Sequence, residues 1–116
     1  MAARYLPDRG DLVWLTPSPQ SGHEQAGRRP ALVLTPKAYN RKVGLALFCP
    51  ITTRVKGYPF EVAIPASLPV GGVVLSDQIK SLDWQAREAV YAATLPDENL
   101  AEVLGKVASL LQELDG

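Results

Sequence analysis

The chain has 116 residues, 47% apolar and 21% charged, so it has the length of one ordinary domain and enough apolar material for a single core. No run approaches the roughly 18 apolar residues of a membrane span, and residues 1–10 lack a signal peptide's apolar segment, so we expect one cytoplasmic domain over residues 1–116. Cys49 and His23 are the only cysteine and histidine, which excludes an internal disulfide and leaves no Cys/His set for zinc.

Charge is divided unequally along the chain, although the formal net charge is zero. Residues 1–60 contain nine Lys or Arg and three acids, whereas residues 61–116 contain three bases and nine acids. Between Gln25 and Phe60 there are seven basic residues and no acid. A face built from these residues would attract an anionic ligand such as nucleic acid. On charge alone, neutralisation in space by the acids of the second half is an equally open interpretation.

Five short apolar or alternating runs predict strands, and each is bounded by turn-forming residues: 11–15, 31–34, 45–49, 60–64 and 72–75. The run at 45–49 is apolar throughout, so we expect it at the centre of a sheet and ended by Pro50. Thr35 and Pro36 predict one helical turn that ends at Asn40. Short strands spaced in this way predict an antiparallel β barrel or sandwich.

The last segment has the periodicity of an amphipathic helix. Its apolar residues recur at intervals of three and four from Leu100 to Leu114, and Pro96 suits the first turn. We expect this helix to pack against the sheet. The fold class predicted is therefore mainly β with a C-terminal helix.

Two long polar connections, at 16–28 and 52–59, contain no material for a core, and such loops are where function usually lies on a small barrel. If the fold brings them together, Glu24, Arg29, Thr52 and Arg54 would surround one pocket. That pocket would offer a carboxylate for proton transfer, two cations for a phosphate and a hydroxyl. Spacing alone does not show this convergence.

Five segments together resemble one family in order and spacing: GDLVW at 10–14, EQAGRRP at 24–30, TT at 52–53, KGYPF at 56–60 and SDQIK at 76–80. They are similar to the MazF/PemK family of toxin endoribonucleases, most closely its MazF branch. The resemblance implies an SH3-like antiparallel β barrel, shared with CcdB-like toxins, and a homodimer. It also implies metal-independent, sequence-specific cleavage of single-stranded RNA by an mRNA interferase, and inhibition by a MazE-like antitoxin with an acidic tail.

The resemblance also implies site residues. The family's catalytic Arg falls on Arg29 and its catalytic Thr on Thr52, while Glu24 matches the acid in the same loop. In the Kid-like branch an acid at the position of Asp77 is taken as the base, with an Arg two residues earlier. Leu75 stands there in this chain, so Asp77 is a secondary candidate.

The expected chemistry needs no cofactor, because RNA carries its own nucleophile in the 2′-hydroxyl. The products would be a 2′,3′-cyclic phosphate and a 5′-hydroxyl. A guanidinium, with a pKa above ~12, is hard to deprotonate. We therefore expect Arg29 to clamp the phosphate, Glu24 to be the base and Thr52 to donate a hydrogen bond.

The remaining candidates have two interpretations each. His23 is a secondary acid or base, or an exposed loop histidine. The cations expected to contact RNA are either phosphate ligands or solvated charges: Arg28, Arg54, Lys56 and Lys80. Tyr58 either stacks on a base or anchors its loop, and Gln78 lies in the same matched segment as Asp77.

One alternative function belongs to another class. A non-catalytic, CcdB-like toxin on the same barrel would inhibit DNA gyrase by binding it. Such a toxin has no reason to keep the run from Glu24 to Pro30, so that run favours the endoribonuclease.

Overall fold

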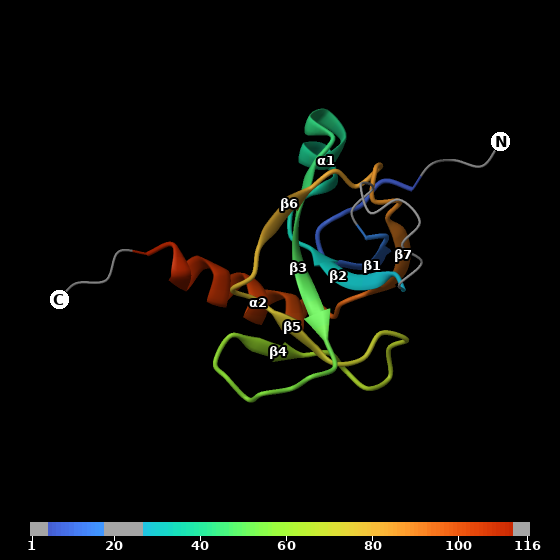
Figure 1. Ribbon diagram of the computed structural model, residues 1–116. Coiled ribbons are helices and arrows are strands. Elements are labelled where there is room, and N and C mark those ends of the chain that lie inside the picture. Colours follow the sequence, from blue (N-terminus) through green and yellow to red (C-terminus); the bar gives the residue numbers. More distant parts are fainter. Residues whose placement is uncertain (1–4, 18–26, 113–116) are drawn as a thin grey trace.

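The computed structural model describes residues 5–17 and 27–112, which form one seven-stranded sheet and two helices (Figure 1). In chain order the elements are β1 (Asp11–Leu15), β2 (Arg29–Val33), α1 (Lys37–Val43), β3 (Ala46–Thr52), β4 (Glu61–Ala63), β5 (Val73–Leu75), β6 (Lys80–Leu82), β7 (Val90–Thr94) and α2 (Asp97–Leu110). The predicted fold class, mainly antiparallel β with a C-terminal helix, is confirmed.

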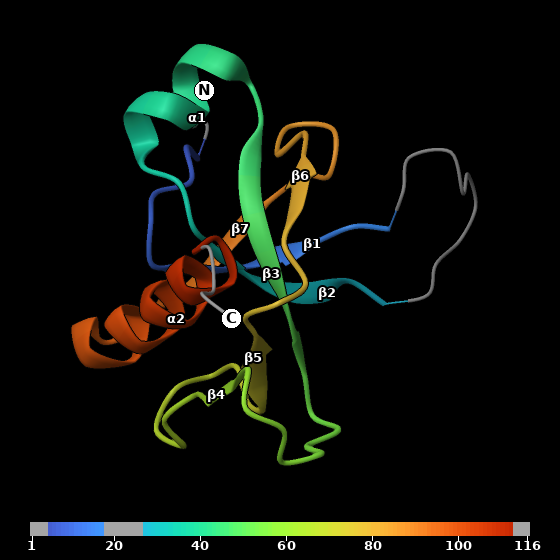
Figure 2. The ribbon, with the colours of Figure 1, turned by 90° about the vertical axis from the view of Figure 1, so that its left-hand side faces the viewer.

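The sheet is organised around β3. Its strand order is β4-β5-β3-β2-β1-β7, and β6 pairs with the first half of β3. Every strand pairing in the described residues is antiparallel. Figure 2 shows β3 running the height of the sheet, with α1 at one end and β4 and β5 at the other. The central position expected for the apolar run at 45–49 is therefore confirmed.

The prediction that Pro50 ends this strand is wrong, since β3 continues to Thr52. Pro50 faces Ala31 of β2 on one side. On the other side β6 pairs with β3 only as far as Phe48, and β5 pairs from Ile51 onwards. Pro50 thus lies in the gap between two partner strands, where a missing N–H is tolerated.

Helix α1 is longer than the predicted turn, and Asn40 does not end it. The Asn40 side chain is fully buried and donates to the carbonyls of Pro7 at 2.8 Å and Thr35 at 2.9 Å, so it ties the helix to the sheet. The helix ends at Gly44, whose φ of 81° is left-handed. Helix α2 follows Pro96 as predicted, and its Val103 is fully buried.

The core lies on both faces of the sheet, because successive strand residues point to opposite faces. One cluster joins the sheet to α2 and includes Leu12, Leu32, Cys49, Ile51 and Val103. The other consists of Val13, Leu15, Ala31, Val33, Ala46, Phe48 and Trp84. Burial raises the pKa of the Cys49 thiol to about 12, so this side chain packs as a protonated thiol in the core.

Two strands, β6 and β7, were not predicted. Strand β6 has only three residues, of which two are exposed and none is buried. Strand β7 is the edge next to β1, and Val90 and Tyr91 at its start are exposed. Neither segment has the alternation of a half-buried strand. None of the helices in the described ranges is long and apolar enough to cross a membrane.

Candidate functional site

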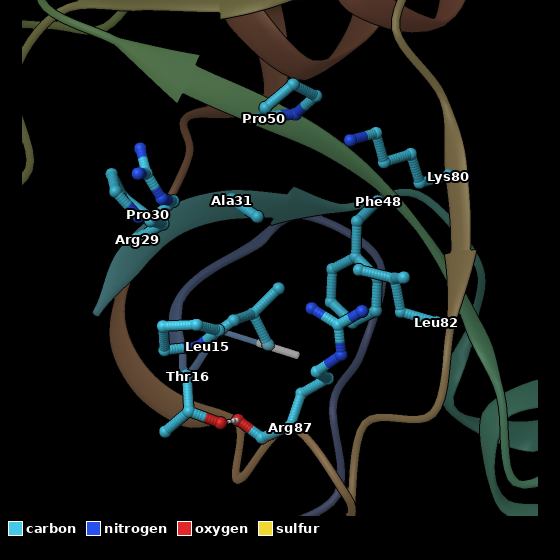
Figure 3. A pocket seen from close by; sticks show the side chains of 11 residues that line it. Leu15, Thr16, Arg29, Pro30, Ala31, Phe48, Pro50, Lys80, Leu82 and Arg87 are labelled. Atoms are coloured by element: carbon cyan, nitrogen blue, oxygen red, sulfur yellow. Dashed lines mark hydrogen bonds between the residues drawn. The ribbon is translucent and has the colours of Figure 1, made fainter. Parts of the chain in front are cut away.

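A pocket of about 280 Å³ opens on the face of the sheet opposite α2 (Figure 3). Its lining comes from β1, β2, β3, β6 and the turn that follows β6: Leu15, Thr16, Pro17, Arg29, Pro30, Ala31, Phe48, Pro50, Lys80, Leu82 and Arg87. Most of this lining is apolar. The pocket therefore has a hydrophobic floor with a few polar groups around it, which is the usual composition of a ligand site.

Strand register explains why these residues meet. Arg29 lies opposite Leu15, and Phe48 lies opposite Lys80. Directly opposed residues of antiparallel strands share a face, as do residues two apart on one strand. Four strands thus send alternate side chains to the same side of the sheet, and the pocket forms where those side chains do not fill the space.

In the part of the chain that the structure describes, the charged groups of the lining are all cationic: Arg29, Lys80 and Arg87. In Figure 3, Arg29 stands at one side of the pocket, Lys80 at the other, and the Arg87 side chain rises between them. Within residues 5–17 and 27–112, the ion pair formed is that of Lys106 with Glu102, on α2 and away from this lining. Three cations without a carboxylate in the lining create a positive field directed at an anionic ligand.

Arg29 and Thr52 lie on the same face of the sheet. The register of β2 and β3 places Ala31 opposite Pro50, and two residues further along each strand it leads to Arg29 and Thr52. Arg29, Ala31 and Pro50 all line the pocket. Thr52 is not part of that lining but continues the same face of β3 at its end. The two residues predicted to act on one phosphate are thus on neighbouring strand ends.

The end of β3 is held by a close backbone contact from Gly72. Thr52 pairs with Val73 of β5, and Gly72 precedes it with a φ of 110°. A Cβ added to Gly72 would lie 2.2 Å from the Thr52 carbonyl oxygen. On the side-chain side, Thr52 Oγ1 accepts a hydrogen bond from the Arg54 amide at 3.1 Å, which leaves its own proton available to donate.

Gly72→Ala is therefore expected to displace Thr52. Backbone strain alone should lower the free energy of unfolding by about 1–3 kcal/mol, and the clash with Thr52 adds to it. The rate of RNA cleavage should fall as well, because Thr52 is displaced. The matched control is Gly71→Ala, because a Cβ there meets no atom within 4 Å. Thermal unfolding of both variants checks this, and equal stability of the two would contradict the contact.

The loop between β3 and β4 is tied down at several points. Glu61 accepts hydrogen bonds from the amides of Lys56 at 2.9 Å and Gly57 at 2.8 Å. The Tyr58 hydroxyl donates to Asp77 Oδ1 at 2.8 Å, and this bond raises the pKa of Tyr58. Of the two interpretations of Tyr58, loop anchoring thus gains a specific contact. The bond also brings Asp77, after β5, beside this loop.

Of the other predicted RNA contacts, Arg28, Arg54, Lys56 and Gln78 do not line the pocket. Arg54, Lys56 and Gln78 are exposed. Arg28 donates to the carbonyl of Glu88 at 2.5 Å. The site residue that sequence reasoning missed is Arg87, since it lies in the acidic half of the chain, and no motif quoted from the sequence includes it. Only the unpredicted strand β6 explains how its turn reaches the pocket.

Glu24 and His23 lie outside the described residues, so their predicted roles stay predictions. Within the described ranges, no group of three or more His, Cys, Asp or Glu side chains is placed to hold a metal ion. Trp84 is buried in its own chain, and its indole N–H donates to the Asn40 carbonyl at 3.0 Å.

Comparison with known proteins gives concordant results. A family model described as PemK-like, MazF-like toxin of type II toxin–antitoxin system matches residues 8–111. The endoribonuclease toxin MazF of Escherichia coli K12 is 47% identical over 111 residues, which cover 96% of this chain and 99% of that protein. The endoribonuclease PemK of Escherichia coli is 34% identical over 90% of this chain and 81% of its own.

Solved structures agree with this match. A crystal structure of MazE–MazF from Deinococcus radiodurans aligns with a TM-score of 0.84 and 54% identity, over 95% of this chain and 99% of that one. A crystal structure of MazF from the same organism aligns with a TM-score of 0.82 and 61% identity, over 92% and 97% of the two chains.

Proposed function

This chain belongs to the family of PemK-like, MazF-like toxins of type II toxin–antitoxin systems and is an endoribonuclease of that family; we propose that the pocket beside Arg29 binds its RNA. The observation that supports this most strongly is the charge of the lining. Three cations surround an apolar floor, and none of the described lining residues is a carboxylate. An unpaired nucleotide has matching chemistry, with an apolar base and an anionic phosphate.

Catalysis follows from where these groups lie. We assign Arg29 to the scissile phosphate, because it stands at the rim of the pocket on the same face as Thr52. The two N–H groups of a guanidinium fit two phosphoryl oxygens, and their benefit grows as charge develops on the phosphorus. The Thr52 hydroxyl has its proton free to donate to the same group. Lys80 and Arg87 then bind the neighbouring phosphates or stabilise the negative charge that develops at the scissile phosphate.

The reaction itself is a transfer within the RNA. The 2′-hydroxyl gives its proton to the base, for which we keep Glu24, and the 2′ oxygen attacks the adjacent phosphorus. The bond to the 5′ oxygen breaks as the new bond forms, and this oxygen takes a proton from water, which leaves a 2′,3′-cyclic phosphate and a 5′-hydroxyl. Side chains supply all of the charge in this scheme, so we propose that cleavage needs no metal.

The toxin's protein partner is a cognate antitoxin, as in the MazE–MazF complexes of its relatives. We propose that an acidic segment of the antitoxin occupies the cationic pocket and competes with RNA for it. Such binding should weaken as the salt concentration rises, because salt screens the attraction between the acidic segment and the cations of the pocket. We also propose that the chain acts as a homodimer in the cytoplasm, where messenger RNA is translated. A CcdB-like inhibitor of gyrase is not favoured, since the curated relatives are named endoribonucleases.

Binding of single-stranded RNA tests the pocket directly. With a 2′-deoxy residue blocking cleavage, Lys80→Gln and Arg87→Gln should each weaken binding. Each should also reduce the slope of log K against log salt by about 0.7, the value for one phosphate contact on a single strand. Arg41→Gln, an exposed arginine on α1, is the control and should leave the slope unchanged. Unaltered slopes in the two pocket variants would argue that RNA binds elsewhere.

A further inference from the structure

The turn from Asp83 to Ala89 carries Arg87 into the pocket. Hydrogen bonds between residues of the turn itself hold its backbone in place. Asp83 Oδ1 accepts from the amides of Gln85 at 3.0 Å and Ala86 at 2.9 Å. The Arg87 amide donates to the Asp83 carbonyl at 3.0 Å, and the Ala89 amide donates to that of Trp84, also at 3.0 Å. Because Trp84 is buried, these bonds fix the base of the turn to the core.

The backbone of the same turn also accepts hydrogen bonds from two residues that flank the connection between β1 and β2. Thr16 donates twice to the Arg87 carbonyl, from its amide and from Oγ1, at 2.9 Å each. The bond from Thr16 Oγ1 to the Arg87 carbonyl is the dashed line in Figure 3. Arg28 donates to the next carbonyl, that of Glu88, at 2.5 Å. Two consecutive carbonyls of the turn are thus bound by two residues that are twelve positions apart in the sequence.

Glu88 has the backbone conformation that most needs such support. Its φ of 52° makes it the one residue other than glycine with a positive φ in the described ranges. A non-glycine residue in this region is strained and persists only where the surrounding contacts hold it. The hydrogen bond from Arg28 to its carbonyl is such a contact, and it lies one residue from Arg87.

We propose that Arg28 and Thr16 are positioning residues that hold Arg87 in the pocket, and that Arg28 affects RNA through Arg87 without contacting a phosphate itself. This rests on the proposed function, in which Arg87 contacts RNA. These hydrogen bonds fix the backbone of Arg87, so its side chain starts from a set place at the pocket, and less conformational freedom is lost when it contacts a phosphate. The sequence-based expectation for Arg28 was a direct phosphate contact, and the two roles make different predictions.

A double-mutant cycle distinguishes the two roles of Arg28, positioning of Arg87 and direct contact with a phosphate. Binding of a non-cleavable single-stranded RNA, with a 2′-deoxy residue at the cut, is measured for Arg28→Gln, Arg87→Gln and the pair. We expect Arg28→Gln alone to raise Kd about tenfold, the loss of roughly one hydrogen bond from a charged donor. In the Arg87→Gln background it should change neither Kd nor the salt slope. Arg54→Gln is the control, and its effect should be equal in both backgrounds.

Thr16→Val is the second variant, because it removes only the Oγ1 donor and keeps the amide. It should weaken binding in the wild-type chain and have no effect in Arg87→Gln. If Arg28→Gln raises Kd equally in both backgrounds and lowers the salt slope by about 0.7 in each, Arg28 contacts phosphate and the proposal is overturned. An unchanged Kd in Arg28→Gln alone overturns it too. If Arg87→Gln itself binds RNA normally, the failure lies in the proposed function of the pocket.

Discussion

Replacing Arg29 with glutamine is expected to reduce kcat on a short single-stranded RNA by about 10²- to 10³-fold, the usual cost of removing one donor from a developing oxyanion. Arg29 stands at the pocket rim, at the start of β2, and β1 and β3 flank it. Glutamine keeps a polar side chain but removes the charge and the paired N–H groups. Since the contact strengthens in the transition state, kcat and kcat/KM should fall by similar factors.

Stability should change little in this variant. Arg29 is exposed, and substitutions at such positions usually shift the free energy of unfolding by less than about 0.5 kcal/mol. Arg41→Gln removes an equally exposed charge from α1 and should cleave as the wild type does. Steady-state kinetics and thermal unfolding measure both effects. A rise in KM with unchanged kcat would show that Arg29 binds the ground state and the transition state equally, which contradicts a role in the chemical step.

Glu24→Gln is expected to slow cleavage by about 10²- to 10⁴-fold, the range for a general acid or base. Among residues 5–17 and 27–112, no carboxylate lines the pocket, so a carboxylate base would come from outside that described lining. The sequence provides Glu24 and Asp77 as the two candidates. Asp77 already accepts the Tyr58 hydroxyl at 2.8 Å, and that bond serves to anchor the loop.

Asp77→Asn is the matched comparison, because it makes the same change of charge at the other candidate. We expect it to reduce kcat less than tenfold, which is below the range for a lost base. Cleavage rates for both variants over a range of pH values decide between the two. Near-normal turnover in Glu24→Gln, together with loss of activity in Asp77→Asn, would transfer the role of base to Asp77.

The sequence was most informative where a periodic pattern was buried. The apolar run at 45–49 became the centre of β3, and the stripe that includes Val103 became the buried side of α2. The motifs also singled out Arg29 and Thr52, and the structure places both at strand ends. What the motifs did not contain was the register, and it is the pairing of Ala31 with Pro50 that puts both residues on one face.

Arg87 could not be predicted for a related physical reason. It reaches the pocket on a turn after β6, and β6 exists because Lys80–Leu82 pair with β3, although the segment has no apolar alternation. Such pairing is a long-range property, and short exposed strands leave little trace in a single sequence. Pro50 was misjudged likewise, because the gap between β5 and β6 that tolerates it is tertiary.

The central claim is that side chains alone, without a metal ion, promote attack of the RNA 2′-hydroxyl on the adjacent phosphorus. The most direct measurement is the mapping of new ends after the purified protein acts on a long unstructured RNA in excess EDTA. We predict cleavage at one recurring short sequence, with 5′-hydroxyl and 2′,3′-cyclic phosphate ends, and complete protection by a single 2′-deoxy substitution at the cut. Cleavage that requires added magnesium, or that persists at the 2′-deoxy position, would contradict it.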